Sequence, residues 1–247
     1  MKKNLLFCVL CVLMALTSCK IDVNNLEIGK RIEPSSTIVK KEFQQPAFDK
    51  VEVEVTANVK FIQSKEGDYR VVISAPDNYI ELFELTTDAN RLSVDFVRNN
   101  VNIDVNNVDV TIYSPTLQSF ENSGVSNVEI NRLNADELTL ENSGVGKMFI
   151  DGLTVRTIDV NCSGVGGIEL SGSADEAILN CSGVGGINAK NLKARNVDAD
   201  VSGVGGIECF ASESIHGNVS GVGSLKYAGN PSRKEFNRTG IGSLDNL

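Results

Sequence analysis

Hydrophobic and polar residues alternate along most of this chain, and from residue 120 onward the alternation itself repeats about every 20 residues. The repeats align on a Ser-Gly or Thr-Gly pair, whose glycines lie 18 to 20 residues apart. These glycines are Gly124, Gly144, Gly164, Gly183, Gly203, Gly221 and Gly240. Alternation with a period of two predicts β-strands, and the repeats lack the 3.6-residue period of a helix. A sequence period this short and regular predicts a solenoid, in which each repeat forms one coil.

Four columns of the aligned repeats are mainly apolar: the column four residues before the glycine, and those one, four and six residues after it. Polar residues such as Glu129 and Glu169 stand between the last two columns. We therefore expect each coil to contain a strand, a glycine-rich corner, a second strand and a looser turn. Stacked coils lie about 4.8 Å apart, so we expect every apolar column, including Val145, Val165 and Val184, to form a buried ladder.

The glycines have a mechanical explanation, because a tight corner needs positive φ or close backbone approach, which a residue without Cβ tolerates best. The sequence thus predicts an all-β fold, a parallel β-helix that is right-handed by the rule for parallel crossovers. One polar column, three residues before each glycine, holds only carboxylates and amides: Glu121, Glu141, Asn161, Asn180, Asp200, Asn218 and Asn237. We interpret this column as a hydrogen-bonded ladder that stabilises the stacked strands, with a binding stripe as the alternative.

Residues 38–117 lack the glycine signature but contain several short alternating segments, among them 51–55 and 101–105. A single helical turn is expected between Asp77 and Phe83, after Pro76. We expect this region to supply the opening coils or a β-rich cap of the solenoid, since an open coil end exposes an unpaired strand edge. The repeat β-helix would then occupy residues 118–247.

The first 18 residues have the features of a bacterial signal peptide. Lys2 and Lys3 precede an apolar run over residues 5–16, which is too short to span a bilayer. The run ends in Leu-Thr-Ser-Cys19, which resembles the lipobox of bacterial lipoproteins and implies lipid attachment at Cys19. Residues 19–37 are polar and are predicted to be a flexible tether. We therefore expect a lipoprotein of the bacterial cell envelope, held at the outer membrane by its lipid; a plain secretory signal is the alternative.

The net charge and the counts of histidine and cysteine limit the functions that this chain can have. The net charge of −9 argues against binding to nucleic acid, which requires neutralisation of phosphates. His216 is the only histidine, so a His-based triad or a multi-His metal site cannot form within one chain, and we expect no metal and no cofactor.

Cys162 and Cys181 share one column, and the spacing of adjacent coils permits a disulfide between them. Cys209 falls in an apolar column and is expected to be a small core residue.

The main enzymatic alternative is a β-helix polysaccharide lyase or hydrolase, which would need paired carboxylates on one face. Glu121 and Glu141 are the nearest candidates, because they share a column in adjacent coils. No column of Arg or Lys accompanies them in the repeats, and aromatic residues that could stack on sugars are sparse. We therefore expect no catalytic residues and no enzymatic activity.

Four segments carry a resemblance to a known family: 48–53, 113–117, the Ser-Gly-Val-Gly copies from Ser143 onward, and Lys226-Tyr-Ala-Gly-Asn-Pro231. Over about residues 43 to 247 the chain resembles the head GIN domain of autotransporter-adhesin-like lipoproteins of Bacteroidetes-type bacteria. Ser126 departs from the pattern, since later copies have glycine there. The resemblance implies a binding module for a glycan or protein ligand, but it transfers no binding residues, which stay unknown. A periplasmic structural or assembly module is the alternative, and the sequence leaves self-association into a homo-oligomer open.

Overall fold

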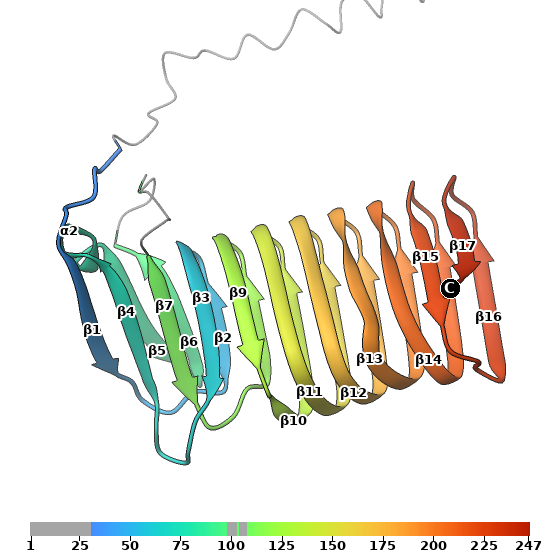
Figure 1. The fold of residues 1–247 in the computed structure, drawn as a ribbon, viewed down its shortest axis with the longest axis horizontal. Helices are drawn as coiled ribbons and strands as arrows, with labels where there is room; N and C mark the ends of the chain where they lie inside the picture. The colour runs from blue at the N-terminus through green and yellow to red at the C-terminus, as the bar shows by residue number, and fades with distance from the viewer. Residues whose placement is uncertain (1–30, 98–102, 104–107) are drawn as a thin grey trace, which may run out of the picture.

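The computed structural model describes residues 31–97, 103 and 108–247. Its stacked parallel coils of about 20 residues form a β-solenoid of about six turns, which confirms the predicted all-β solenoid. Figure 1 shows a rod with β1 (Ile38–Gln44) at one end and β17 (Ser243–Asn246) at the other. Cys19, the expected signal peptide, most of the expected tether and all but one residue of the segment 101–105 lie outside the described residues.

The repeat region stacks its coils in sequence order, and each strand pairs in parallel with a strand of the preceding coil. Its strands are β8 (Ser119–Asn122), β9 (Val125–Asn131), β10 (Asn134–Asn142), β11 (Val145–Cys162), β12 (Val165–Cys181), β13 (Val184–Val201), β14 (Val204–Val219), β15 (Ser224–Ala228), β16 (Arg233–Arg238) and β17. The columns of the sequence are ladders of the structure: Val165 is paired with Val145 on one side and with Val184 on the other. The longest strands continue around the looser turn, so one strand contributes to two sides of a coil.

The N-terminal half joins the same solenoid, but not in sequence order. The coil formed by β2 (Lys50–Val53) and β3 (Thr56–Gln63) lies between two later segments of the chain. On one side it pairs with β8 and β9, and on the other with β6 (Arg91–Phe96) and β7 (Asp109–Ser114), all parallel. Apolar residues coincide across these ladders, because Val51 is paired with both Leu92 and Phe120.

Antiparallel strands close this end of the rod, as the expected cap. β4 (Arg70–Pro76) pairs antiparallel with β7, β1 pairs antiparallel with β4, and β5 (Phe83–Asp88) pairs antiparallel with β6. The expected helical turn is α2 (Asp77–Ile80). Tyr79 of α2 is fully buried, and its hydroxyl donates a hydrogen bond of 2.6 Å to the carbonyl oxygen of Ile32. The end of the segment expected as a tether therefore lies against the cap.

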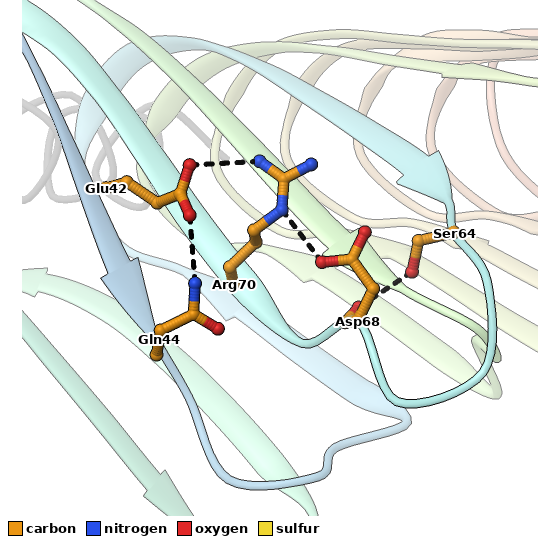
Figure 2. A network of polar contacts seen from close by, with 5 residues as sticks. All are labelled: Glu42, Gln44, Ser64, Asp68 and Arg70. Atoms are coloured by element: carbon orange, nitrogen blue, oxygen red, sulfur yellow. Dashed lines mark hydrogen bonds and ion pairs between the residues drawn. The ribbon is translucent and has the colours of Figure 1, made fainter.

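Arg70 ties the outer strands of the cap together (Figure 2). Its Nε donates to Asp68 Oδ1 at 2.8 Å, and its NH1 donates to Glu42 Oε2 at 3.3 Å. Glu42 Oε1 in turn accepts a hydrogen bond of 2.9 Å from Gln44 Nε2, while Ser64 Oγ donates to the Asp68 carbonyl oxygen at 2.7 Å. These contacts join β1, β4 and the preceding turn, so the edge of the cap is held by polar side chains as well as by its ladder.

The interior contains the apolar columns four residues before the glycine and four and six residues after it, as predicted. The column directly after the glycine is different: Val145, Val165 and Val184 are 47%, 53% and 56% exposed. The prediction that this column is buried was wrong. The inward phase of the second strand runs through the second, fourth and sixth residues after the glycine. The second position is glycine in every copy except the first, where the Ser126 side chain is buried. A Cβ on Gly166 would lie 1.9 Å from the carbonyl oxygen of Gly146.

Candidate binding surfaces of the solenoid

The corner edge of the rod carries a continuous row of exposed apolar side chains, here called the valine ridge. Seven of the 12 large hydrophobic side chains that are exposed in the described residues belong to it. Its members are Val125, Val145, Val165, Val184, Val204, Val222 and Ile241. A contiguous exposed apolar surface of this kind is typical of interaction sites.

A hollow runs beside the ridge, here called the glycine trough. It is lined by the Ser-Gly-Val corners of successive coils, from Ser123 to Val222, so that glycines lie between a row of serines and the ridge. Close stacking enforces the trough: a Cβ on Gly164 would lie 2.1 Å from the carbonyl oxygen of Gly144. The same carbonyl accepts a hydrogen bond of 3.0 Å from the Val165 backbone nitrogen. The trough is therefore a consequence of the ladder.

The column of amides and carboxylates is a hydrogen-bonded ladder in the C-terminal coils, as predicted. Asn180 Nδ2 donates to Asn161 Oδ1 at 3.1 Å, and Asn218 Nδ2 donates to Asp200 Oδ2 at 2.6 Å. Asn237 Nδ2 then donates to Asn218 Oδ1 at 3.4 Å. These side chains satisfy one another along the stack, which accounts for the column structurally.

At the other end the same column holds stacked glutamates. Glu121 lies between Glu52 and Glu141 in the ladder, so the structure brings together the carboxylate pair that the sequence suggested. Burial raises the pKa of Glu121, and the charges of Glu52 and Glu141 raise it further. Arg91 NH1 lies 3.4 Å from Glu52 Oε2 and 3.3 Å from Glu121 Oε2, so one cation bridges two of the three carboxylates.

Sequence reasoning missed Arg91, because β6 reaches this face only through the coil that is inserted between β6 and β8. Arg91 is paired with Lys50, which is paired in turn with Ser119 of β8. No spacing in the sequence indicates this neighbourhood. Glu52 and Glu121 are thus ion-paired members of this ladder.

Another groove lies on the outer face of the second strands of the coils. Gly167, Gly186 and Gly206 line it together with Glu169, Asn188, Glu208 and neighbouring residues. Phe149 borders the groove and is 41% exposed. Asn188 Oδ1 is buried and has no hydrogen-bond partner. This face combines an aromatic ring with carboxylates and an amide, the groups that suit a polar ligand with apolar faces.

His216 lies on β14, as an exposed residue of the outer face. Its Nδ1 is 3.6 Å from Asp198 Oδ1, and both side chains are more than half exposed. Together with Glu235 and Arg233 it lines a shallow groove of mixed charge. His216 is therefore an ordinary surface residue.

The three cysteines of the described part are buried and free. Cys162 and Cys181 are paired in the ladder, as the repeat alignment predicted. A hydrogen bond between the two thiols lowers the pKa of Cys181 and raises that of Cys162. Burial raises the pKa of Cys209 to about 12, which suits its expected role as a core residue.

Within residues 31–97, 103 and 108–247, no group of three or more His, Cys, Asp or Glu side chains could hold a metal ion. Nor does any helix in that part of the chain have the length and hydrophobicity needed to cross a membrane.

The stacked coils and their repeated surface columns define this chain as a β-solenoid repeat protein. A family model described as "putative auto-transporter adhesin, head GIN domain" matches residues 47–231, and the chain belongs to this family. A solved structure of a putative adhesin from Bacteroides fragilis is 35% identical, with a TM-score of 0.84, and the match covers 87% of this chain and 100% of that one. A comparison with curated proteins found no match.

Two more distant structures share the fold. One is a putative adhesin from Parabacteroides distasonis, 20% identical with a TM-score of 0.65, over 88% of this chain and 100% of that one. The other, from the same organism, is named a putative lipid binding protein and is 18% identical with a TM-score of 0.66, over 88% of this chain and 100% of that one. At these identities the likeness concerns the fold alone. The membership of an adhesin-like family indicates a surface or envelope-associated protein with a non-enzymatic role.

Proposed function

We propose that this chain is a lipoprotein of the bacterial outer membrane, anchored through Cys19, that binds an extended glycan or protein ligand as an adhesin. The observation that carries the proposal is the repetition of surface columns along a stiff rod. The corner of each coil presents nearly the same side chains as the next, so a repetitive ligand gains one similar contact per coil. The adhesin description of the family supports this reading.

The groove beside Phe149 is the surface that best fits a glycan. A sugar ring has an apolar face, which an exposed aromatic ring can cover. Its hydroxyls can donate hydrogen bonds to the carboxylates of Glu169 and Glu208, which line the same groove. Without side chains on the three glycines, a ring can approach the backbone of the sheet. This surface therefore deserves the first binding test.

A binding screen of the full chain against glycans and extracellular-matrix proteins tests the adhesin function. We expect at least one class to bind, and Phe149→Ala to weaken binding of a glycan several-fold. Ile178→Ala, on the other outer face and 38% exposed, is the matched control and should leave binding unchanged. Failure to bind any class would contradict the adhesin function and favour a periplasmic assembly role. Release of sugar fragments would indicate an enzyme instead.

A separate experiment tests the proposed lipid anchor at Cys19. Replacing Cys19 with serine removes the thiol that the lipid requires, so the chain should leave the membrane fraction of fractionated cells. Protease treatment of intact cells then distinguishes an outward-facing adhesin, which is cleaved, from an inward-facing lipoprotein, which is spared. Retention of Cys19→Ser in the membrane fraction would contradict a lipid anchor at this residue.

A further inference from the structure

We propose that the corner edge of the rod is a self-association surface, on which two copies of this chain lie side by side and parallel. The valine ridge of each copy would insert into the glycine trough of the other. Self-pairing does not depend on the ligand-binding function proposed above. Only the placement of both copies on one membrane rests on the proposed anchor.

The shape of the edge favours pairing with a second copy. In every coil the serine, the glycine and the valine lie next to one another, so a row of protruding side chains adjoins a hollow of the same length. When two such edges face each other around a two-fold axis parallel to the rod, each ridge lies over the trough of the other copy. A two-fold axis perpendicular to the rod would place ridge on ridge. The edge is therefore self-complementary for parallel rods, as an isologous dimer requires.

The spacing of the ridge along the rod also favours a second copy as the partner. The members of the ridge recur once per coil, about 4.8 Å apart. A partner can engage several of them together only if its own protrusions have the same spacing. Another copy of this chain meets that condition with every coil, because the ladder of Val145, Val165 and Val184 is built identically in each copy.

The charge and the exposed area of the edge suit self-pairing. The protein carries a net charge of −9, yet the corner sequences from Ser123-Gly-Val125 to Thr239-Gly-Ile241 contain no charged residue. Two copies can therefore approach along this edge without bringing charges together. With about half of each valine exposed, the ridge offers roughly 500 Å² per copy, so mutual insertion would bury roughly 1,000 Å², the lower limit for a specific interface. We expect a dimer of modest affinity.

The position of the chain's entry into the rod suits a parallel pair. The described chain begins beside α2 at the cap end, where Asn78 Oδ1 accepts a hydrogen bond of 3.0 Å from the Ser35 backbone nitrogen. In a parallel pair both chains enter at the same end. A parallel dimer is thus compatible with two anchors in a single membrane, whereas an antiparallel pair would place the anchors at opposite ends.

Single cysteines on the ridge test the pairing in the full chain produced in bacterial cells. Val125→Cys and Val222→Cys lie near opposite ends of the ridge, so each variant alone should be joined to its own copy by a short bis-maleimide. We expect a covalent dimer at least fivefold above Asp198→Cys, an exposed position on an outer face. The native chain gives the background, since Cys162, Cys181 and Cys209 are buried.

Three outcomes would overturn the proposal or revise its geometry. Yields equal to those of Asp198→Cys would exclude self-pairing through this edge. Cross-linking only between Val125→Cys and Val222→Cys, when both variants are present, would show an antiparallel pair and exclude the parallel one. Retention of the dimer after Val165→Asp with Val204→Asp, in the Val125→Cys background, would show that the ridge is not the contact. Both valines are more than half exposed, and circular dichroism checks that this variant is folded.

Discussion

Asn122 and Asn142 face each other in the interior of the solenoid, where Asn122 Nδ2 donates a hydrogen bond of 3.0 Å to Asn142 Oδ1. Both side chains are fully buried. Asn142 Nδ2 donates in turn to the carbonyl oxygen of Gly146 at 3.1 Å. In the following coils the same column holds Cys162 and Cys181. Two coils near the cap thus use polar residues at a position where later coils use thiols and then valines.

Substitutions of Asn122 and Asn142 should have strongly non-additive effects on the stability of the fold. Asn142→Val alone removes one acceptor of the Asn122 amide and leaves it the hydrogen bond of 3.4 Å to the Ser126 carbonyl oxygen, and the loss of a buried hydrogen bond costs about 0.5 to 1.5 kcal/mol of stability. The double variant Asn122→Val with Asn142→Val removes both partners, and valine already occupies this column at Val201 and Val219. We therefore expect the double variant to melt close to the native chain in circular dichroism. A double variant less stable than the single one would contradict this account.

The corner glycines should tolerate no side chain. At Gly164 a Cβ would lie 2.1 Å from the Gly144 carbonyl oxygen, so Gly164→Ala must push two coils apart. We expect a loss of more than about 3 kcal/mol, measured as a fall in the melting temperature. Gly67→Ala is the matched control: no atom lies within 4 Å of its Cβ, but its φ of +81° is strained for alanine and should cost only about 1 kcal/mol. Equal losses in the two variants would argue against the steric explanation.

Much of this fold could be predicted from the sequence because a solenoid repeats its local rules. The glycine spacing gave the coil length, and the alternation gave the core columns. The exposure of Val145 was missed, since its residue type suggested burial while its odd offset from Met148 indicated the outward phase. Arg91 could not be found beside Glu121, because that contact depends on the order in which coils are stacked. Side-chain periodicity carries no information on that order.

Glu121 should make stability depend on pH. Its pKa in the folded state is raised above the ordinary carboxyl value of 4.5, so its ionised form is less favourable in the folded chain than in the unfolded one. Glu121→Gln should therefore stabilise the chain at pH 7 relative to its effect at low pH. The advantage should shrink as the pH falls through the raised pKa and disappear below the ordinary value.

Thermal denaturation of Glu121→Gln at pH 7 and at pH 3.5 measures this difference. The exposed Glu66→Gln, in a turn, controls for the loss of one negative charge. Equal stabilisation of Glu121→Gln at both pH values would show that the effect does not come from ionisation.

The buried cysteines should be protected from reagents. Cys162, Cys181 and Cys209 are each 1% exposed, so an alkylating reagent should modify them only after unfolding. Peptide mass mapping before and after denaturation checks this at each site. Modification of Cys181 while the chain retains its circular dichroism would indicate local opening of that coil. A linked Cys162–Cys181 peptide before reduction would contradict the free thiols of the structure.

The coil of β2 and β3 also affects how the molecule can be assembled. Its residues 50–63 have one set of partners in 91–114 and the other in 119–131, so neither ladder exists when they leave the ribosome or a translocation pore. The first ladder of this early segment must wait until the chain has extended to about residue 114, and its second ladder until about residue 131. The N-terminal half is therefore the template on which the first glycine repeat stacks, and a cut after residue 117 would separate two parts that complete each other.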